Sequence, residues 1–201
     1  MRKGELTRAA IVDAALDVAS RNGLEGLTIG MLADRMGMSK SGVFAHFGSR
    51  EELQMAVLKS YQQHFEQEVF LPSLKEARGI VRLTSMFERW VRRVSVEIAA
   101  ACMYISGAVE YDDRPGPIRA ELLAMVQTWQ GALMRCVAQA IDTGELKADT
   151  DAQQIVFEMY GLILALHHDA RFLRMPGSTG RARKGFLRLL GFYQTERHPP
   201  P

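Results

Sequence analysis

The chain has 201 residues, of which 47% are hydrophobic and 24% are charged, and its formal net charge is +2. This composition supplies enough apolar residues for a core and excludes both a disordered chain and a chain that is basic throughout. Its two cysteines, Cys102 and Cys136, are too few and too far apart for a disulfide framework or a zinc module.

Residues 1–70 are expected to form four helices, separated by residues that begin or end helices. We place these helices at about 5–22, 28–37, 39–47 and 49–70. The residues expected to cap them are Thr28, Ser39 and Ser49 with Glu52, and the glycines expected to end them are Gly23 and Gly37.

The rest of the chain also shows helical periodicity, with apolar residues three and four positions apart. We expect helices at about 80–94, 96–111, 117–144, 150–174 and 179–194. Pro117 is well placed at a helix start, and Thr150 with Gln153 forms a second capping box. No stretch alternates apolar and polar residues as a strand would, so the predicted fold class is all-α.

We expect two domains. The boundary is predicted within the long fourth helix, because no flexible linker interrupts it. Residues 1–60 would form a first domain of three helices, with the fourth helix continuing as a connector to about residue 70. Residues 61–201 would form a second helical domain.

Residues 28–47 have the features of a helix-turn-helix. Ala33 is small enough for a second helix to cross closely, Gly37 permits a tight turn, and Met38 and Val43 can anchor the second helix. This arrangement leaves the second helix free to enter a DNA major groove, although three helices packed together without a DNA role would show the same spacing. The expected exposed positions are Lys40, Ser41, Gly42, Ala45 and His46.

Residues 6–58 resemble the DNA-binding domain of the tetracycline-repressor (TetR) family of bacterial transcription regulators. The resemblance lies in Arg21-Asn22-Gly23 and in the string LTIGMLADRMGMSKSGVFAHFGSREEL. The chain departs from the usual family pattern at Ser41-Gly42 (usually Gly-Thr), at Ala45 (usually aromatic) and at Arg50 (usually lysine). Residues 102–174 resemble one type of the family's ligand-binding domain more loosely, through GAVEYDDRPGPIR and the helix with His167-His168-Asp169.

The resemblance implies a ligand-responsive, dimeric repressor that binds a palindromic DNA operator and is released by a small molecule. Phosphate contacts are expected from Thr28, Ser39 and Arg50, and base contacts from Ser41, Gly42 and His46. Lys40 can reach either a guanine edge or a phosphate. Phe44 occupies the place of the family's phosphate-facing aromatic residue, and without a hydroxyl it can offer only packing.

The helix near 150–174 carries apolar residues on two sides and must therefore be buried on two sides. Together with the last helix it predicts a four-helix interface between two copies of the chain. The expected interface residues are Ile155, Met159, Leu162, Leu166, Phe186, Leu189 and Tyr193, beside the small Gly185.

Methionine and aromatic residues in the second domain indicate a pocket for an apolar or aromatic effector, although plain core packing would produce the same pattern. The expected lining residues are Trp90, Met103, Tyr104, Met125, Trp129, Phe157, Tyr160 and His168. His167 and His168 have no ligand residue at the i+3 or i+4 spacing that a metal needs on one helix, so no metal and no cofactor are expected.

The alternatives are an all-helical enzyme and a helical interaction module without a DNA role. The chain has no HExxH, GxSxG, GxGxxG or P-loop string, so we expect no enzyme activity. The longest uncharged apolar-rich run, between Glu97 and Glu110, is shorter than the ~20 residues needed to cross a bilayer. We therefore expect a cytoplasmic protein without a membrane partner.

Overall fold

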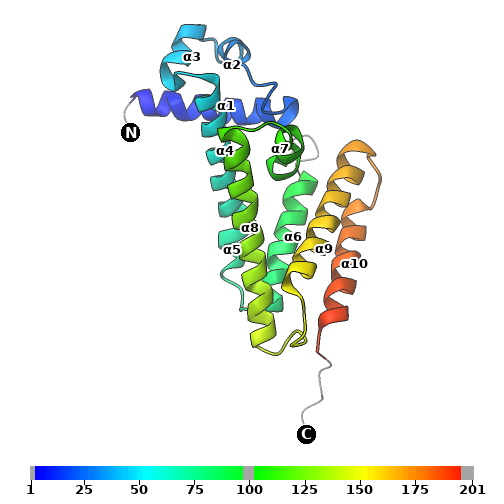
Figure 1. The fold of residues 1–201 in the computed structure, drawn as a ribbon. Helices are drawn as coiled ribbons and strands as arrows, with labels where there is room; N and C mark the ends of the chain where they lie inside the picture. Colours follow the sequence, from blue (N-terminus) through cyan, green and yellow to red (C-terminus); the bar gives the residue numbers. More distant parts are fainter. Residues whose placement is uncertain (1–2, 97–101, 196–201) are drawn as a thin grey trace. The chain divides into compact units, whose positions relative to one another are not determined.

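The structure is a computed structural model that describes residues 3–96 and 102–195 (Figure 1). Over these ranges the regular elements are helices, which confirms the all-α prediction. They are α1 (Lys3–Asn22), α2 (Ile29–Met36), α3 (Lys40–Phe47), α4 (Arg50–Phe65), α5 (Leu71–Ser73), α6 (Ile80–Val96), α7 (Met103–Tyr111), α8 (Pro117–Asp142), α9 (Ala152–His167) and α10 (Ser178–Tyr193). Two π-helical segments, Glu66–Phe70 and His168–Phe172, follow α4 and α9. Residues 97–101 of the helix expected at 96–111 lie outside the described ranges.

Three of the predicted N-caps are confirmed. Thr28 Oγ1 accepts a hydrogen bond from the N–H of Met31 at 3.2 Å, and Ser39 Oγ accepts one from the N–H of Gly42 at 3.0 Å. Ser49 Oγ accepts a hydrogen bond from the backbone N–H of Glu52 at 3.0 Å. These bonds satisfy N–H groups that have no partner within the helix, so they set where α2, α3 and α4 begin.

The cap of α9 is Asp151, and the prediction of Thr150 at this position is wrong. Asp151 Oδ1 accepts hydrogen bonds from the N–H groups of Gln153 and Gln154 at 2.8 and 3.1 Å. A carboxylate is the stronger acceptor, and its charge is favoured by the helix dipole at this end.

The described chain forms two compact units. The first contains residues 3–65 and 102–126, and the second contains residues 66–96 and 127–195. The sequence places residues 102–126 with the second domain, whereas by packing they belong with the first unit. Their contacts in the first unit join residues more than 40 positions apart, which local sequence patterns do not report.

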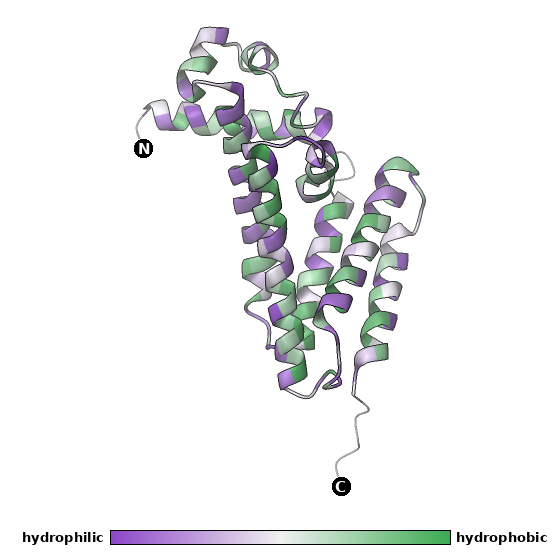
Figure 2. Ribbon diagram, viewed as in Figure 1, coloured by the Kyte–Doolittle hydropathy of each residue, from purple (hydrophilic) through white to green (hydrophobic). Residues whose placement is uncertain are grey.

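In the first unit α1 and α4 pack against each other, and both carry apolar residues (green in Figure 2). Ile11 and Ala15 of α1 and Leu53 and Val57 of α4 are all fully buried. The Asp17 carboxylate pairs with both Arg21 and Arg35, and so ties α2 to α1.

In the second unit α6, α9 and α10 pack around stacked aromatic rings. The rings of Phe87 and Phe186 lie 4.0 Å apart and almost parallel. A Cβ atom at Gly185 would lie only 2.5 Å from Leu162 Cδ2, so this glycine allows α10 to approach α9 closely within one chain.

Candidate DNA-binding interface

Helices α2 and α3 form the helix-turn-helix that the sequence predicts. Gly37 ends α2 in the left-handed conformation, with φ 62°, and the N–H of Met38 donates to the Ala33 carbonyl at 2.9 Å. Ala33 of α2 and Val43 of α3 are both buried. The small residue at 33 and the glycine at 37 thus allow the close crossing for which a helix-turn-helix is built.

The exposed surface of α3 agrees with most of the expected positions. Lys40, Ser41, Phe44 and Ala45 are exposed, whereas Gly42 and His46 are half-buried. A Cβ atom at Gly42 would lie 3.1 Å from Ser39 Oγ, so the capping serine leaves little space for a side chain there.

A corner suited to an anion lies at the start of α2. Thr28 is exposed, and a methyl group placed on Gly30 would lie 3.4 Å from Cε and 3.7 Å from Nζ of Lys40. The Lys40 ammonium therefore lies beside the first turn of α2, where free N–H groups and the helix dipole also favour negative charge. One phosphate could contact all of these groups.

Arg50, expected to contact phosphate, is engaged within the protein. Its Nε donates to the Leu27 carbonyl at 2.9 Å, and Nη2 donates to the Glu25 carbonyl and pairs with Glu25 Oε2 at 3.3 Å. Arg50 thus holds the turn between α1 and α2, just before the N-cap of α2. These interactions engage Nε and Nη2, and the Glu25 carboxylate offsets part of the guanidinium charge.

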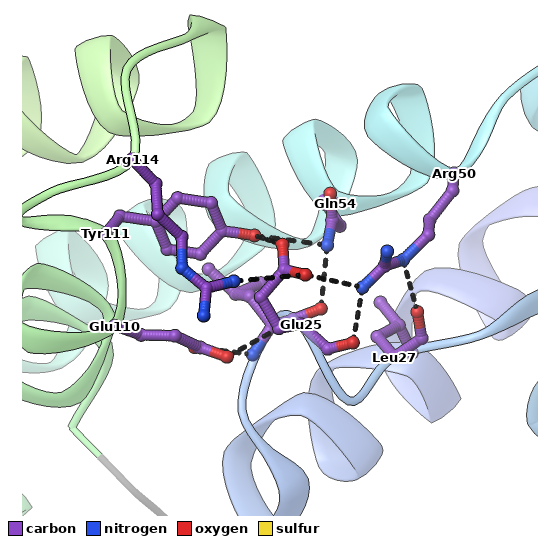
Figure 3. A network of polar contacts seen from close by, with 8 residues as sticks. Glu25, Leu27, Arg50, Gln54, Glu110, Tyr111 and Arg114 are labelled. Atoms are coloured by element: carbon purple, nitrogen blue, oxygen red, sulfur yellow. Dashed lines mark hydrogen bonds and ion pairs between the residues drawn. The ribbon is translucent and has the colours of Figure 1, made fainter.

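The same turn is held from the end of α7 (Figure 3). The Glu110 carboxylate accepts hydrogen bonds from the backbone N–H groups of Leu24 and Glu25, at 2.9 and 2.8 Å. Gly23, immediately before, has φ 78°, and a Cβ atom there would lie 2.6 Å from Glu110 Oε1. The glycine therefore permits both the turn and the close approach of the carboxylate.

Tyr111 extends this network to α4. Its hydroxyl donates to Glu25 Oε1 at 2.6 Å, and Gln54 Nε2 donates both to the Tyr111 hydroxyl at 3.2 Å and to the Leu24 carbonyl at 2.7 Å. Arg114 Nη1 pairs with Glu25 Oε2 at 3.3 Å. We call residues 25, 50, 54, 110, 111 and 114 the turn clamp.

The turn clamp keeps Glu25 ionised. The hydrogen bond from Tyr111, followed by the charges of Arg50 and Arg114, lowers the pKa of Glu25 below its usual value. Burial and the bond to Glu25 raise the pKa of Tyr111, so the phenol keeps its proton. Sequence reasoning missed this network, because Glu25 and Tyr111 are separated by 86 positions.

The eight expected effector-binding residues divide between the units. In the second unit Trp90 packs edge-on against Trp129 at 5.5 Å and against Tyr160 at 4.8 Å between ring centroids. Phe157 is 74% exposed, and the His168 side chain is 58% exposed. The members in the first unit are Met103, Tyr104 and Met125, all of which are buried.

The Tyr104 ring belongs to an aromatic cluster of the first unit. It lies 4.6 Å from the Phe65 ring and 5.5 Å from the Tyr61 ring. The Tyr61 hydroxyl donates to Cys102 Sγ at 3.3 Å. Tyr104 therefore lies in a different compact unit from the Trp90 cluster.

His167 is half-buried at the end of α9. Burial, followed by the charges of Arg171 and His168, lowers its pKa. Within residues 3–96 and 102–195, no three His, Cys, Asp or Glu side chains gather in a way that could hold a metal ion. No helix in the same ranges is long and apolar enough to cross a membrane.

Most of the residues expected at the dimer interface are buried within the single chain. Ile155, Met159, Leu166 and Phe186 are at most 2% exposed, and Leu189 is 7% exposed. Leu162 and Tyr193 are half-buried. The exposed apolar residues of the same two helices are instead Phe157, Leu164, Leu187 and Phe192.

Two neighbouring grooves in the second unit share Phe157 and Gly161. One, of about 620 Å³, runs between α9 and α10 past Phe192, and the other, of about 490 Å³, includes Leu164 and Tyr160. We call Phe157, Gly161, Leu164 and Phe192 the α9–α10 face. This face contains three of the exposed apolar residues of these helices, and the fourth, Leu187, lies outside both grooves.

Comparison with known proteins agrees with this architecture. Residues 11–57 match the family described as bacterial regulatory proteins, tetR family, and residues 79–186 match the tetracyclin repressor-like C-terminal domain. The HTH-type transcriptional regulator SrpR of Pseudomonas putida is 26% identical over 203 residues, covering 98% of this chain and 89% of SrpR.

Solved structures show the same fold. A TetR transcriptional regulator from Chloroflexus aurantiacus has a TM-score of 0.84 at 20% identity, with 96% of each chain covered. AibR, solved with isovaleryl coenzyme A and operator DNA, has a TM-score of 0.69 at 20% identity, covering 93% of this chain and 97% of AibR. Since the C-terminal family domain alone spans more than half of the chain and the N-terminal domain contains the helix-turn-helix described above, the chain belongs to the TetR family of bacterial transcriptional regulators, which are DNA-binding proteins and not enzymes.

Proposed function

We propose that this regulator is a repressor that binds a palindromic operator as a homodimer in the cytoplasm, and that a small apolar or aromatic molecule releases it. The observation that carries the proposal is the exposed α3 surface beside the cationic corner of Lys40 and the start of α2. In a helix-turn-helix this places groups for bases and groups for phosphate next to each other.

The DNA contacts then divide into two kinds. Thr28 and Lys40 would bind phosphate at the N-terminus of α2, because hydroxyl, ammonium and free N–H groups meet there. The Ser39 hydroxyl caps α3 and also shares a hydrogen bond with the Ser41 hydroxyl, so Ser39 would contribute chiefly by fixing that helix. Ser41 and Phe44 lie on the exposed surface of α3 that would face the DNA major groove. Gly42 and His46 are half-buried at the edge of this surface.

The second unit is proposed to carry the effector response. Trp90 and Trp129 are buried and Tyr160, in ring contact with Trp90, is half-buried, so an apolar molecule could contact this cluster by displacing a ring. AibR, which has the same fold, was solved in complex with isovaleryl coenzyme A and operator DNA. An effector releases DNA only if it binds the released state more tightly than the DNA-bound state.

The dimer is proposed to form through the α9–α10 face. Phe157 and Phe192 are 74% and 70% exposed, and two such surfaces related by a two-fold axis would cover each other. Dimeric binding explains why the operator would be palindromic, since each half-site is read by one copy of α3.

The test is selection of duplex DNA from a random-sequence library with the full-length protein. We expect enrichment of an inverted repeat that binds one dimer, and loss of that complex on adding an apolar compound that also changes tryptophan emission. The compounds tested are a broad panel of hydrophobic and aromatic molecules, with isovaleryl coenzyme A added because AibR was solved with it. If no sequence is enriched over bulk DNA, the regulator function is refuted and a helical interaction module becomes the better description.

A further inference from the structure

The exposed side of α3 has few hydrogen-bonding groups. Its four exposed residues are Lys40, Ser41, Phe44 and Ala45, and two of these have only hydrocarbon side chains. Phe44 is 50% exposed, although an aromatic ring in this unit could have been buried in the core as Phe47 is. The Phe44 ring therefore forms a large apolar part of the α3 surface that would enter the DNA major groove.

The polar groups nearby are partly committed. Ser39 Oγ accepts the Gly42 N–H and lies 3.1 Å from Ser41 Oγ, so the two hydroxyls share a hydrogen bond. His46 is half-buried, with its ring centroid 6.5 Å from that of Phe47. Lys40 lies beside the first turn of α2, next to the expected phosphate. Few donors remain to distinguish one base edge from another.

We propose that Phe44 determines operator specificity by contacting the 5-methyl group of thymine, with Ala45 beside it. Ser41 and Phe44 are three positions apart and so lie on one face of α3, where both can face the same groove. In the major groove, thymine alone among the four bases presents a methyl group, and apolar side chains recognise it by contact. The proposal rests on the proposed function, because it requires α3 to enter a major groove.

Contact of Phe44 with a thymine methyl group can be distinguished from packing of the ring against the DNA backbone. A ring that only packed against sugar and phosphate would contribute equally to every DNA sequence. A ring that contacts a thymine methyl contributes only where that thymine is present. The operator half-site should therefore contain at least one thymine whose methyl group, rather than its hydrogen-bonding edge, determines affinity.

The experiment uses deoxyuridine, which pairs like thymine but lacks the methyl group. Each symmetric pair of thymines in the selected operator is replaced in turn, and the affinity of the full-length protein is measured for the wild type and for Phe44→Ala. Removing a contacted methyl should weaken wild-type binding about fourfold per half-site. Phe44→Ala should bind the operator with thymine and the operator with deoxyuridine at that position with equal affinity. At the other thymine positions it should respond to deoxyuridine as the wild type does.

Two further variants sharpen the result. Phe44→Leu keeps an apolar tip and should retain part of the methyl dependence, and Phe172→Ala, which removes a 77% exposed ring outside the DNA-binding unit, should retain all of it. The proposal is overturned if no deoxyuridine substitution affects wild-type binding, or if Phe44→Ala shows the same methyl dependence as the wild type. Failure to select any operator would instead refute the proposed function itself.

Discussion

Lys40 and Arg50, two basic residues of the first unit, have different surroundings. Lys40 is exposed and lies beside the start of α2, whereas Arg50 makes hydrogen bonds with Leu27 and Glu25. Both residues carry a positive charge, but the charge of Arg50 is already paired with the Glu25 carboxylate. Lys40 forms no ion pair with another residue in the described parts of the chain. Their substitution should therefore produce different losses.

We expect Lys40→Ala to reduce the salt dependence of DNA binding, with the log–log slope falling by about one unit for each phosphate that the lysine neutralises. Arg50→Ala should weaken binding while leaving this slope nearly unchanged, because its guanidinium acts on the turn before α2. Titrations at several salt concentrations measure both slopes. Lys75→Ala, an exposed lysine outside the unit, is the control, and a fall of about one unit for Arg50→Ala would show that Arg50 binds phosphate.

Because of Glu25, the free energy of unfolding should decrease as the pH becomes acidic. Since its pKa is lower in the folded than in the unfolded state, its contribution is complete above about pH 4.5, the usual value for glutamate, and is lost as pH falls through the folded pKa. In Glu25→Gln this part of the acid dependence should be absent, so its thermal midpoint should be lower at neutral pH and fall less on acidification. Glu51→Gln, at an exposed position, is the matched control. Identical pH curves for Glu25→Gln and the wild type would contradict the assignment.

At the scale of elements, short polar contacts decide where helices start and how turns are held. The α1–α2 turn has its N–H groups bound by Glu110, from α7, and its carbonyls bound by Arg50 and Gln54, from α4. A turn with its backbone polar groups satisfied in this way has few alternative conformations. The turn clamp therefore fixes the position from which α2 begins.

The start of α9 provides a direct comparison of two neighbouring residues. Asp151→Ala should lower the free energy of unfolding by about 1 kcal/mol, because it leaves the N–H groups of Gln153 and Gln154 without their acceptor. Thr150→Ala should cost clearly less, since Thr150 Oγ1 makes no hydrogen bond within the described residues. Denaturant unfolding of both variants decides the matter, and an equal or larger decrease for Thr150→Ala would refute Asp151 as the cap.

At the scale of the whole molecule, the proposed dimer depends on which apolar residues the chain leaves uncovered. Leu189 is 7% exposed and Phe186 is 1% exposed, so charges introduced there would disturb the core of one chain. The α9–α10 face is the better position for a test, because its phenylalanines are exposed and line open grooves.

Phe157→Glu is therefore expected to give a folded monomer at micromolar concentration, because a buried charge without a partner is costly at an interface. Sedimentation velocity measures the state, and the helical signal in circular dichroism should be unchanged. Leu187→Glu, on α10 outside both grooves, should remain dimeric. A dimeric Phe157→Glu would show that the two copies associate through another surface.

The sequence by itself determined the helical class, the helix-turn-helix and the caps at Thr28, Ser39 and Ser49, because each depends on residues within about four positions of one another. Only the tertiary structure decided that Arg50 binds Glu25, that Tyr111 holds the same turn, and that residues 102–126 pack with the first unit. It also decided which apolar side of α9 is buried, since both sides have the same periodicity and only the neighbouring helices distinguish them. Local periodicity reports which residues share a face, whereas the partner of that face is chosen by contacts between distant parts of the chain.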